Sequence, residues 1–397
     1  MPKYHIVFEK YQCYNSIKIK MTHEEKMIQS LYQVPEYNQE KINLAISKMM
    51  NDLKIYDELK PNMKVVIKPN LIMAKPLSSP VTTHPAVIRG VTLWLREQGI
   101  TDITLAESSG GPYLSEYMKN IYRVCEMNQL KDVLKLNDDF SSKTITTKKG
   151  FKNHSFNIIT PIVQADYIIN ICKLKTHAMT GLSAGIKNLF GVIPGLEKPQ
   201  LHYLWPDIED FSNMLLELAQ TVNPNLTIID AIDAMEGNGP TGGTSHHLGL
   251  LLGAKDFYTQ DYFATQLMKI EPNNIVMIRQ AIEKNLINPN EIILKGDPIP
   301  ENLTPFKIPD ARKLDFSNVL PGDLGKIFAK ICSKIFKSFP KVDKTKCIGC
   351  GKCAESCPQK IINIKNKKAH FPRKNCISCF CCQEMCPVKA ISVKRWL

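Results

Sequence analysis

Two cysteine-rich stretches decide the fold of the C-terminal end: CIGCGKCAESCP at residues 347–358 and CISCFCCQEMCP at residues 376–387. Both contain the spacing C-x2-C-x2-C-x3-C-P. A [4Fe–4S] cluster needs four thiolates around a cube, and this spacing is the bacterial ferredoxin arrangement. The sequence therefore predicts two [4Fe–4S] clusters and the passage of electrons through the protein.

In this arrangement the first three cysteines of a run bind one cluster, and the fourth binds the other. The predicted ligands are Cys347, Cys350, Cys353 and Cys386 for one cluster, and Cys376, Cys379, Cys382 and Cys357 for the second. Pro358 and Pro387 turn the chain after each run. We expect a short strand pair between the runs, at about residues 358–375, and another short strand at Ala390–Val393.

Zinc and disulfides are the alternative uses of these cysteines. Zinc sites use two CxxC pairs, and they explain neither the CxxCxxC run followed by x3-C-P nor its duplication. Disulfides do not suit a chain that otherwise resembles an intracellular protein. Cys381 is an extra thiol beside Cys382; we interpret it as a free cysteine, and a spare ligand or a site near the cluster is the alternative.

The remaining composition is that of a globular protein, with 397 residues, 44% hydrophobic and 22% charged. The 340 or so residues before the cysteine runs suffice for one large or two ordinary domains. No apolar run approaches the ~18 residues of a membrane helix. Residues 1–10 do not resemble a signal peptide. We expect a reducing, cytoplasmic location, which oxygen-labile clusters in anaerobic surroundings also favour.

The chain is basic, with a net charge of +13, and much of this charge is C-terminal. From Cys347 to Leu397 there are ten Lys or Arg residues against two Glu. Lysines offset the negative charge of thiolate-bound clusters, and their excess favours an acidic partner such as a ferredoxin or flavodoxin, or a partner enzyme. Nucleic acid is not expected, because no basic, aromatic-rich stripe or nucleic-acid motif is present.

Before residue 319, buried strands alternate with helical patterns, which predicts an α/β domain with a mostly parallel sheet and helices on both faces. The expected domains are 1–318 (α/β), 319–342 (a basic amphipathic linker helix) and 343–397 (a small α+β two-cluster ferredoxin). The expected strands lie at 3–20, 63–67, 103–106, 166–171, 226–230 and 248–252. The expected helices lie at 40–59, 85–97, 180–190, 211–220, 261–270 and 274–284.

The linker region has an apolar stripe at Ile327, Phe328, Ile331, Ile335 and Phe339, with lysines mostly on the other side. We favour a helix packed on the α/β domain, with its lysines in solvent. Peripheral contact with an anionic membrane through residues 324–339 is the less favoured alternative.

Polar residues follow four of the expected strands. Ligands gather at the carboxyl ends of strands in open α/β sheets, so we expect these loops to form one cleft. Lys68, Lys173, Lys175 and Lys187 would make this cleft cationic and suited to a carboxylate or phosphate. The complete set of expected substrate-binding residues is Lys68, Asn70, His84, Lys173, Lys175, Lys187 and Asn188.

The expected catalytic residues are His177, Glu107 and Asp233. His177 or Glu107 would supply protons, and His84 and His177 titrate near neutrality, so they are also candidates for metal binding. Asp233, with Asp230 and Glu236, could pair with the lysines, bind a cation or act as an acid or base. Each of these residues taken alone is more often structural, and only their convergence favours a binding cleft.

Several known motifs are absent: a P-loop, HExxH and a GxSxG elbow. Gly237, Gly239 and Gly242 have the letters of a dinucleotide fingerprint, but Pro240 and the absence of a following helical pattern indicate a flexible loop. Bound NAD or flavin is therefore not indicated.

The large domain resembles the domain-of-unknown-function 362 family over about residues 40–300. The resemblance rests on VIKPNL at 66–71, TTHP at 82–85, ESSG at 107–110, KLKTH at 173–177 and GIKN at 185–188. Members of this family are often fused to a two-cluster ferredoxin. The resemblance implies one α/β unit in an iron–sulfur oxidoreductase context, and it implies no particular substrate.

These observations favour a ferredoxin-dependent oxidoreductase acting on a small anionic substrate in the Lys/His-lined cleft. The alternative is a non-catalytic subunit that carries electrons, or delivers a cofactor or metal, and docks on a partner enzyme. A weaker third hypothesis is a non-redox enzyme with structural or sensing clusters.

Overall fold

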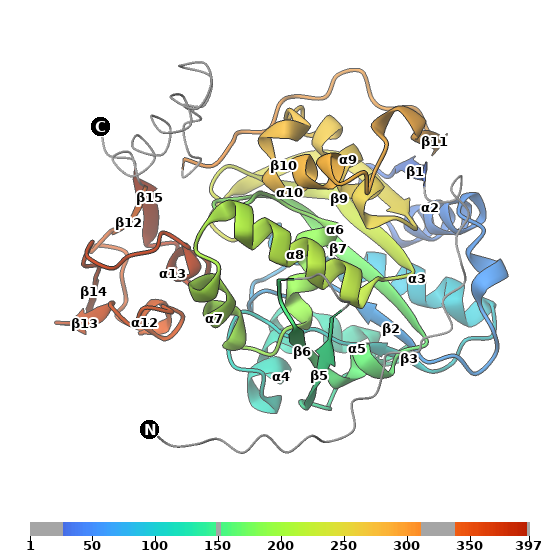
Figure 1. Ribbon diagram of the computed structural model, residues 1–397. Helices are drawn as coiled ribbons and strands as arrows, with labels where there is room; N and C mark the ends of the chain where they lie inside the picture. The colour runs from blue at the N-terminus through green and yellow to red at the C-terminus, as the bar shows by residue number, and fades with distance from the viewer. Residues whose placement is uncertain (1–26, 148–151, 311–337, 395–397) are drawn as a thin grey trace.

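A computed structural model describes residues 27–147, 152–310 and 338–394. Its centre is a sheet with the strand order β11-β1-β10-β9-β7-β2-β3-β4, and β8 pairs with β7 off this path. Strands β9, β7, β2, β3 and β4 run parallel, whereas β10 is antiparallel to both of its neighbours. The mostly parallel α/β sheet predicted from the sequence is confirmed (Figure 1).

The strands of this sheet are β1 (Ile28–Gln33), β2 (Val65–Lys68), β3 (Ile103–Leu105), β4 (Lys135–Leu136), β7 (Tyr167–His177), β8 (Gly181–Ser183), β9 (Leu226–Glu236), β10 (Thr244–Ala254) and β11 (Ile293–Gly296). All eleven residues of β7 are buried, as expected for a central parallel strand covered on both faces. A separate hairpin consists of β5 (Ser142–Thr146) and β6 (Ser155–Ile159).

Helices cover both faces of the sheet. Helices α2 and α3 pack together on one face, and α8, α9 and α10 pack on the other (Figure 1). The helices of the large domain are α2 (Gln39–Asp52), α3 (Pro85–Glu97), α4 (Ser115–Val124), α5 (Thr160–Gln164), α6 (Gly185–Asn188), α7 (Glu197–Leu204), α8 (Ile208–Val222), α9 (Phe257–Leu267) and α10 (Val276–Glu283). Local signals start several of them: Asp207 caps α8, and His84 caps α3 ahead of Pro85.

Some element boundaries differ from those predicted. Strand β7 continues to His177, so residues 173–177 lie in the strand and not in a loop. The helix expected at 180–190 is reduced to the single turn α6 and a following 3-10 turn, because β8 occupies Gly181–Ser183. Helix α4 was not predicted.

The small C-terminal domain contains two short helices and two strand pairs. Helices α12 (Lys352–Glu355) and α13 (Cys381–Glu384) each lie within a cysteine run and contact each other. Strand β13 (Asn363–Lys365) pairs with β14 (Lys368–His370), and β12 (Phe339–Val342) pairs with β15 (Ile391–Lys394). The strand pair between the runs and the strand after the second run are therefore confirmed.

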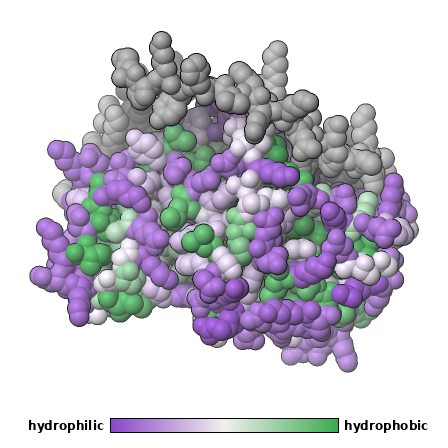
Figure 2. Space-filling view, turned by 90° about the horizontal axis from the view of Figure 1, so that it is seen from below, coloured by the Kyte–Doolittle hydropathy of each residue, from purple (hydrophilic) through white to green (hydrophobic). Residues whose placement is uncertain are grey.

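Two predicted elements lie outside the described residues: the strand within residues 3–20 and the linker helix up to residue 337. Residues 339–342, at the end of the expected linker, form β12 because they pair with β15. In the described part of the chain, no helix is long and apolar enough to cross a bilayer. Seen from below, the surface is mainly hydrophilic with separated apolar areas (Figure 2).

Candidate functional site

The eight cysteines of the two runs line two separate cavities in the small domain. One cavity is lined by Cys347, Cys350, Cys353 and Cys386. The other is lined by Cys357, Cys376, Cys379 and Cys382. These are the two sets predicted from the spacing, including the exchange of the fourth cysteine between runs. The arrangement fits two [4Fe–4S] clusters.

The cysteines surround these cavities and do not gather at single points. Among the described residues, no group of three or more His, Cys, Asp or Glu side chains could hold one metal ion. All eight are free of disulfides.

A third cavity lies between the two domains, at the carboxyl ends of β2, β3 and β7. It contains about 650 Å³ of space, part of it open to solvent. The large domain contributes polar side chains to it, and the small domain contributes Ser356, Cys381, Glu384 and Met385. The polar side chains from the large domain are Asn70, Glu107, Ser108, Lys175, His177, Ser183, Lys187, Asn188, Lys198 and His202. We call this cavity the cleft.

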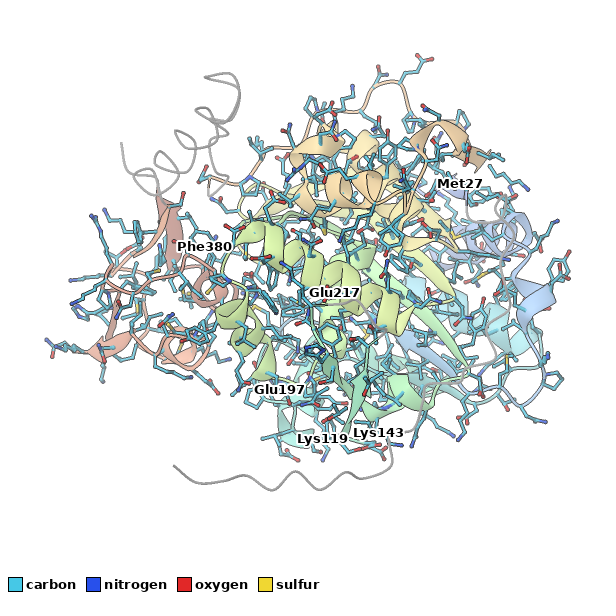
Figure 3. The ribbon with its side chains drawn as sticks, viewed as in Figure 1. Met27, Lys119, Lys143, Glu197, Glu217 and Phe380 are labelled. Atoms are coloured by element: carbon cyan, nitrogen blue, oxygen red, sulfur yellow. The ribbon has the colours of Figure 1, made fainter. Side chains whose placement is uncertain are left out.

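Helix α13 and its neighbours hold the small domain against the cleft. The Thr241 hydroxyl donates to the carbonyl oxygen of Glu384 (2.9 Å), and Lys75 Nζ donates to the carbonyl oxygen of Pro387 (2.6 Å). Phe380 packs on Ala178 at the junction of the domains (Figure 3). The helix that carries the predicted ligand Cys382 therefore also forms a wall of the cleft.

Three buried lysines in the cleft have no carboxylate within ion-pair distance among the described residues. Lys175 Nζ donates to Asn70 Oδ1 and to the carbonyl oxygen of Val81, both at 2.8 Å. Lys198 Nζ donates to Ser108 Oγ (3.1 Å) and to two backbone carbonyl oxygens. Burial lowers the pKa of Lys175 to about 7, with nearby Lys173 adding to the effect, and burial lowers the pKa of Lys198 to about 7.

Lys187 is the least satisfied of the three. Its side chain is 8% exposed, and its ammonium donates no hydrogen bond to any described residue. It lies over the ring of Phe190, with Nζ 4.5 Å from the centroid, a contact that replaces only part of the lost hydration. Burial lowers the pKa of Lys187, and Glu384 counteracts this shift. A buried ammonium without an anion at ion-pair distance is costly unless a ligand supplies the charge.

Lys68 and Glu107 form a buried ion pair beside the cleft. Lys68 Nζ lies 2.5 Å from Glu107 Oε2, and their side chains are 0% and 4% exposed. Burial raises the pKa of Glu107 and lowers that of Lys68, so the two pKa values move toward each other and a proton can be shared. A Cβ atom at Gly191 would collide with both groups, so the pair requires glycine there.

His177 faces the small domain with a fixed tautomer. Its Nδ1 accepts hydrogen bonds from the backbone N–H groups of Met179 and Thr180, so Nε2 carries the proton of the neutral ring. Nε2 lies 3.1 Å from Glu384 Oε1. Burial lowers the pKa of His177, which favours this neutral form. Glu384 thus brings a carboxylate from the small domain to a histidine of the large one.

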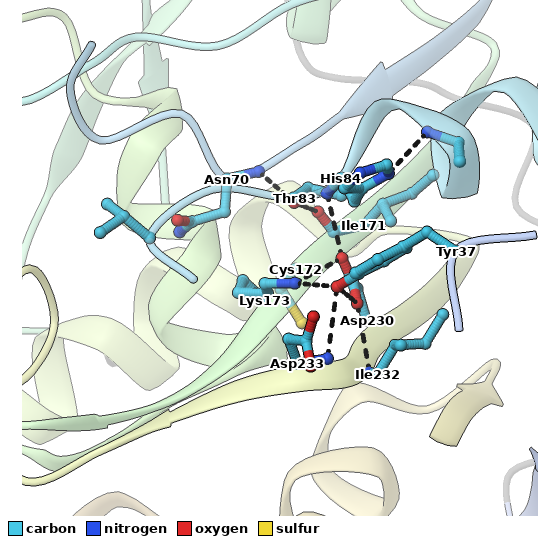
Figure 4. A network of polar contacts seen from close by, with 12 residues as sticks. Tyr37, Asn70, Thr83, His84, Ile171, Cys172, Lys173, Asp230, Ile232 and Asp233 are labelled. Atoms are coloured by element: carbon cyan, nitrogen blue, oxygen red, sulfur yellow. Dashed lines mark hydrogen bonds and ion pairs between the residues drawn. The ribbon is translucent and has the colours of Figure 1, made fainter. Parts of the chain in front are cut away.

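Three residues predicted for the cleft lie elsewhere, which corrects the sequence analysis. Lys173 donates to Asp230 Oδ2 (2.9 Å) and to the hydroxyl of Tyr37, and His84 stacks on the Tyr37 ring with centroids 3.7 Å apart (Figure 4). Asp233 pairs with His247 at the surface (2.8 Å). For Lys173 the cause is the β7–β9 pairing, which changes register between Lys173 and Lys175, so Lys173 faces Asp230 and only Lys175 reaches the cleft.

The other predicted residues do converge: Asn70, Glu107, Lys175, His177, Lys187 and Asn188 line the cleft, and Lys68 reaches it through Glu107. Asn188 Oδ1 accepts from Asn70 Nδ2 (2.8 Å), which orients both amides. Sequence reasoning missed Lys198, His202 and Glu384. Lys198 and His202 are four residues apart on α7, a spacing that places two polar groups on one helix face.

The fold and the cysteine-lined cavities define an α/β protein with an attached iron–sulfur electron-transfer domain. Residues 65–266 match a family described as "Domain of unknown function (DUF362)", and residues 339–387 match a "4Fe-4S dicluster domain". The chain belongs to the DUF362 family and binds [4Fe–4S] clusters through its C-terminal domain.

Two known proteins show the range of similarity. The "Thylakoid-associated protein sll1697" of Synechocystis sp. (strain ATCC 27184 / PCC 6803 / Kazusa) is 29% identical over 280 residues, which are 66% of this chain and 84% of that protein. Among solved structures, the lactate racemase apoprotein from Thermoanaerobacterium thermosaccharolyticum matches with a TM-score of 0.41 and 10% identity, over 64% of this chain and 60% of that one.

Proposed function

We propose that this protein is a ferredoxin-dependent oxidoreductase that binds a small anionic substrate in the cleft. The observation that carries the proposal is Lys187, a buried ammonium with no anionic partner at ion-pair distance, in a cleft bordered by the iron–sulfur domain. An anionic group beside Lys187 would remove the cost of burying this charge. Lys175 and Lys198 add two more donors without carboxylate partners.

The surrounding side chains provide orientation and protons. Asn70 and Asn188 present amides that are already held by hydrogen bonds, so they can position a ligand with little reorganisation. His177, whose Nε2 lies 3.1 Å from Glu384 Oε1, and the Lys68–Glu107 pair are two places where a proton can be held or released. Phe190 and Met385 give the cleft apolar walls that exclude water.

Two [4Fe–4S] clusters complete the proposal, held by the cysteine sets 347/350/353/386 and 357/376/379/382. When bound, such clusters accept and donate single electrons. A two-electron reduction would therefore use both. Iron analysis of anaerobically purified protein should give about eight iron atoms per chain. Half that content, or zinc in place of iron, would contradict two clusters.

The test of the activity is a metabolite screen with anaerobically reconstituted protein under dithionite. We expect reduction of a small carboxylate or phosphate compound that Lys187→Met and Lys175→Met abolish. Lys60→Met, at an exposed lysine, is the matched control. Both variants must retain the iron content of the natural protein. Absence of turnover together with tight co-purification of another protein would instead support the alternative of a non-catalytic electron-carrier or delivery subunit.

A further inference from the structure

The small domain exposes an apolar surface at the first cysteine set. Ile348, Ile364 and Val388 are 60%, 37% and 37% exposed, and all three line the same cavity as Cys347, Cys350, Cys353 and Cys386. Cys350 is itself exposed, whereas Cys379 and Cys382 of the other set are buried. Apolar residues grouped at one point of a surface mark an interaction site more often than scattered ones do.

Lysines surround this apolar group. Lys346, Lys365 and Lys367 are exposed, and the backbone of Lys367 packs against Gly349, directly between Ile348 and Cys350. Lys368 Nζ donates to the carbonyl oxygen of Cys347 at 2.7 Å. Asp343 lies 3.9 Å from Lys346, at the outer limit of an ion pair. Residues 339–394 contain twelve Lys or Arg residues and three Asp or Glu, so negative charge does not neutralise this rim.

The position of this surface leaves it accessible while the small domain is docked. The contacts with the large domain include α13, Phe380, Pro387 and Lys389, and Lys352 Nζ of α12 lies 5.9 Å from the centroid of the Tyr117 ring. Val388, between two of these contact residues, remains 37% exposed. The β13–β14 hairpin, which carries Ile364, Lys365 and Lys367, lies on the side of the small domain away from the large sheet (Figure 1). On the small-domain side of Figure 2, at the left, apolar and hydrophilic residues are closely interleaved.

We propose that Ile348, Ile364 and Val388, with the rim of Lys346, Lys365 and Lys367, form the docking surface for an acidic one-electron carrier protein of the ferredoxin type. An apolar centre with a charged rim is the usual anatomy of a transient protein interface, and the rim charge selects an acidic partner and speeds encounter. The carrier is oxidised by one electron and this chain is reduced by one; no bond forms and no proton moves. The direction of transfer rests on the proposed function.

The test compares two triple charge reversals in the reconstituted full-length protein, with an acidic [2Fe–2S] ferredoxin as the probe. Lys346→Glu/Lys365→Glu/Lys367→Glu changes the docking surface. Lys60→Glu/Lys64→Glu/Lys131→Glu makes the same change in net charge at exposed lysines of the large domain. Association rate and Kd are measured at low ionic strength and again at roughly 1 M salt, where the Debye length is about 3 Å.

We expect the first reversal to slow association about tenfold or more at low salt, and the difference to vanish at high salt. The control reversal should change the rate much less. Ile348→Ser should weaken binding roughly tenfold, mainly through faster dissociation. Equal effects of the two reversals would overturn the proposal. The proposal would also be overturned if the protein, with its clusters intact, failed to bind the carrier. Self-association of this chain that Ile348→Ser abolishes would overturn it too, because the surface would then bind a second copy of the chain.

These measurements separate the docking surface from the function of the cleft. Carrier binding requires no substrate, and anion binding in the cleft can be followed with sulfate in the absence of any carrier. Loss of carrier binding with normal sulfate binding would leave the proposed function in place. Normal carrier binding with no anion binding would contradict the anion-binding cleft and leave the docking surface in place.

Discussion

Lys173 and Lys187 are both buried lysines that sequence reasoning assigns to one substrate site, and the structure separates their roles. Lys173 is the cation of the buried carboxylate Asp230, which also accepts hydrogen bonds from the Tyr37 hydroxyl (3.0 Å) and the backbone N–H of His84 (3.0 Å). Lys187 has no carboxylate of the described residues within ion-pair distance. Replacing each by methionine, which is similar in size and uncharged, should therefore affect different properties.

Lys173→Met should destabilise the large domain by about 3–5 kcal/mol, because it leaves Asp230 buried without its cation. With a urea slope of about 3 kcal/mol per M, the unfolding midpoint should fall by about 1–2 M. Lys187→Met removes a charge that is buried without an ion pair, so the midpoint should stay constant or rise. Unfolding followed by the fluorescence of Trp94 and Trp205 gives both values.

Affinity for sulfate should show the opposite pattern. A hydrogen bond to a charged group contributes about 1.5–3 kcal/mol, so Lys187→Met should weaken sulfate binding roughly 10- to 150-fold in titration calorimetry. The folded fraction of Lys173→Met should bind sulfate within about twofold of the unaltered protein. The reasoning is refuted if Lys187→Met lowers the urea midpoint as much as Lys173→Met does, or if only Lys173→Met weakens sulfate binding.

Three further predictions concern pH, packing and the clusters. Sulfate affinity should be highest below pH 7 and should fall as the pH rises above 7, by up to about tenfold per pH unit for each lysine that binds the anion. The reason is that the pKa values of Lys175 and Lys198 are about 7 without a ligand, and a bound anion raises them. Calorimetry from pH 6 to 9 measures this dependence, and a flat profile would show that neither lysine binds the anion. Gly191→Ala should disrupt the Lys68–Glu107 ion pair beside it and lower the midpoint of thermal unfolding by several degrees. Gly99→Ala is the control: its Cβ would lie in open space, so it reports only the cost of placing alanine in that backbone conformation. Cys357→Ala should remove the cluster held with Cys376, Cys379 and Cys382, and keep the cluster held by Cys347, Cys350, Cys353 and Cys386. Iron content and electron paramagnetic resonance distinguish the two outcomes. Loss of the cluster held by Cys347, Cys350 and Cys353 would contradict the exchange of the fourth cysteine between the runs.

The sequence predicted which cysteines line each of the two cavities, because the spacing within each run groups three of them and the ferredoxin arrangement exchanges the fourth. It also predicted the parallel sheet and most of the cleft, since the carboxyl ends of parallel strands share one edge. Lys173 was assigned wrongly because the length of β7 and its register change depend on pairing with β9. His84 and Asp233 were assigned wrongly because their partners, Tyr37 and His247, lie elsewhere in the sequence. Glu384 was not predicted for the cleft, because only the docking of two domains distant in sequence brings it to His177.

Helix α13 makes the cleft conditional on iron. Its four residues include the predicted ligand Cys382 and end at Glu384, whose carboxylate meets His177 and whose backbone holds Thr241. Such a short helix has little stability by itself and depends on its surroundings. A chain that lost its second cluster to oxygen would therefore also lose a wall of its binding cavity. Under the proposed function, damage to the metal centre and release of the bound anion would occur together, so the protein would not retain a ligand that it could no longer reduce.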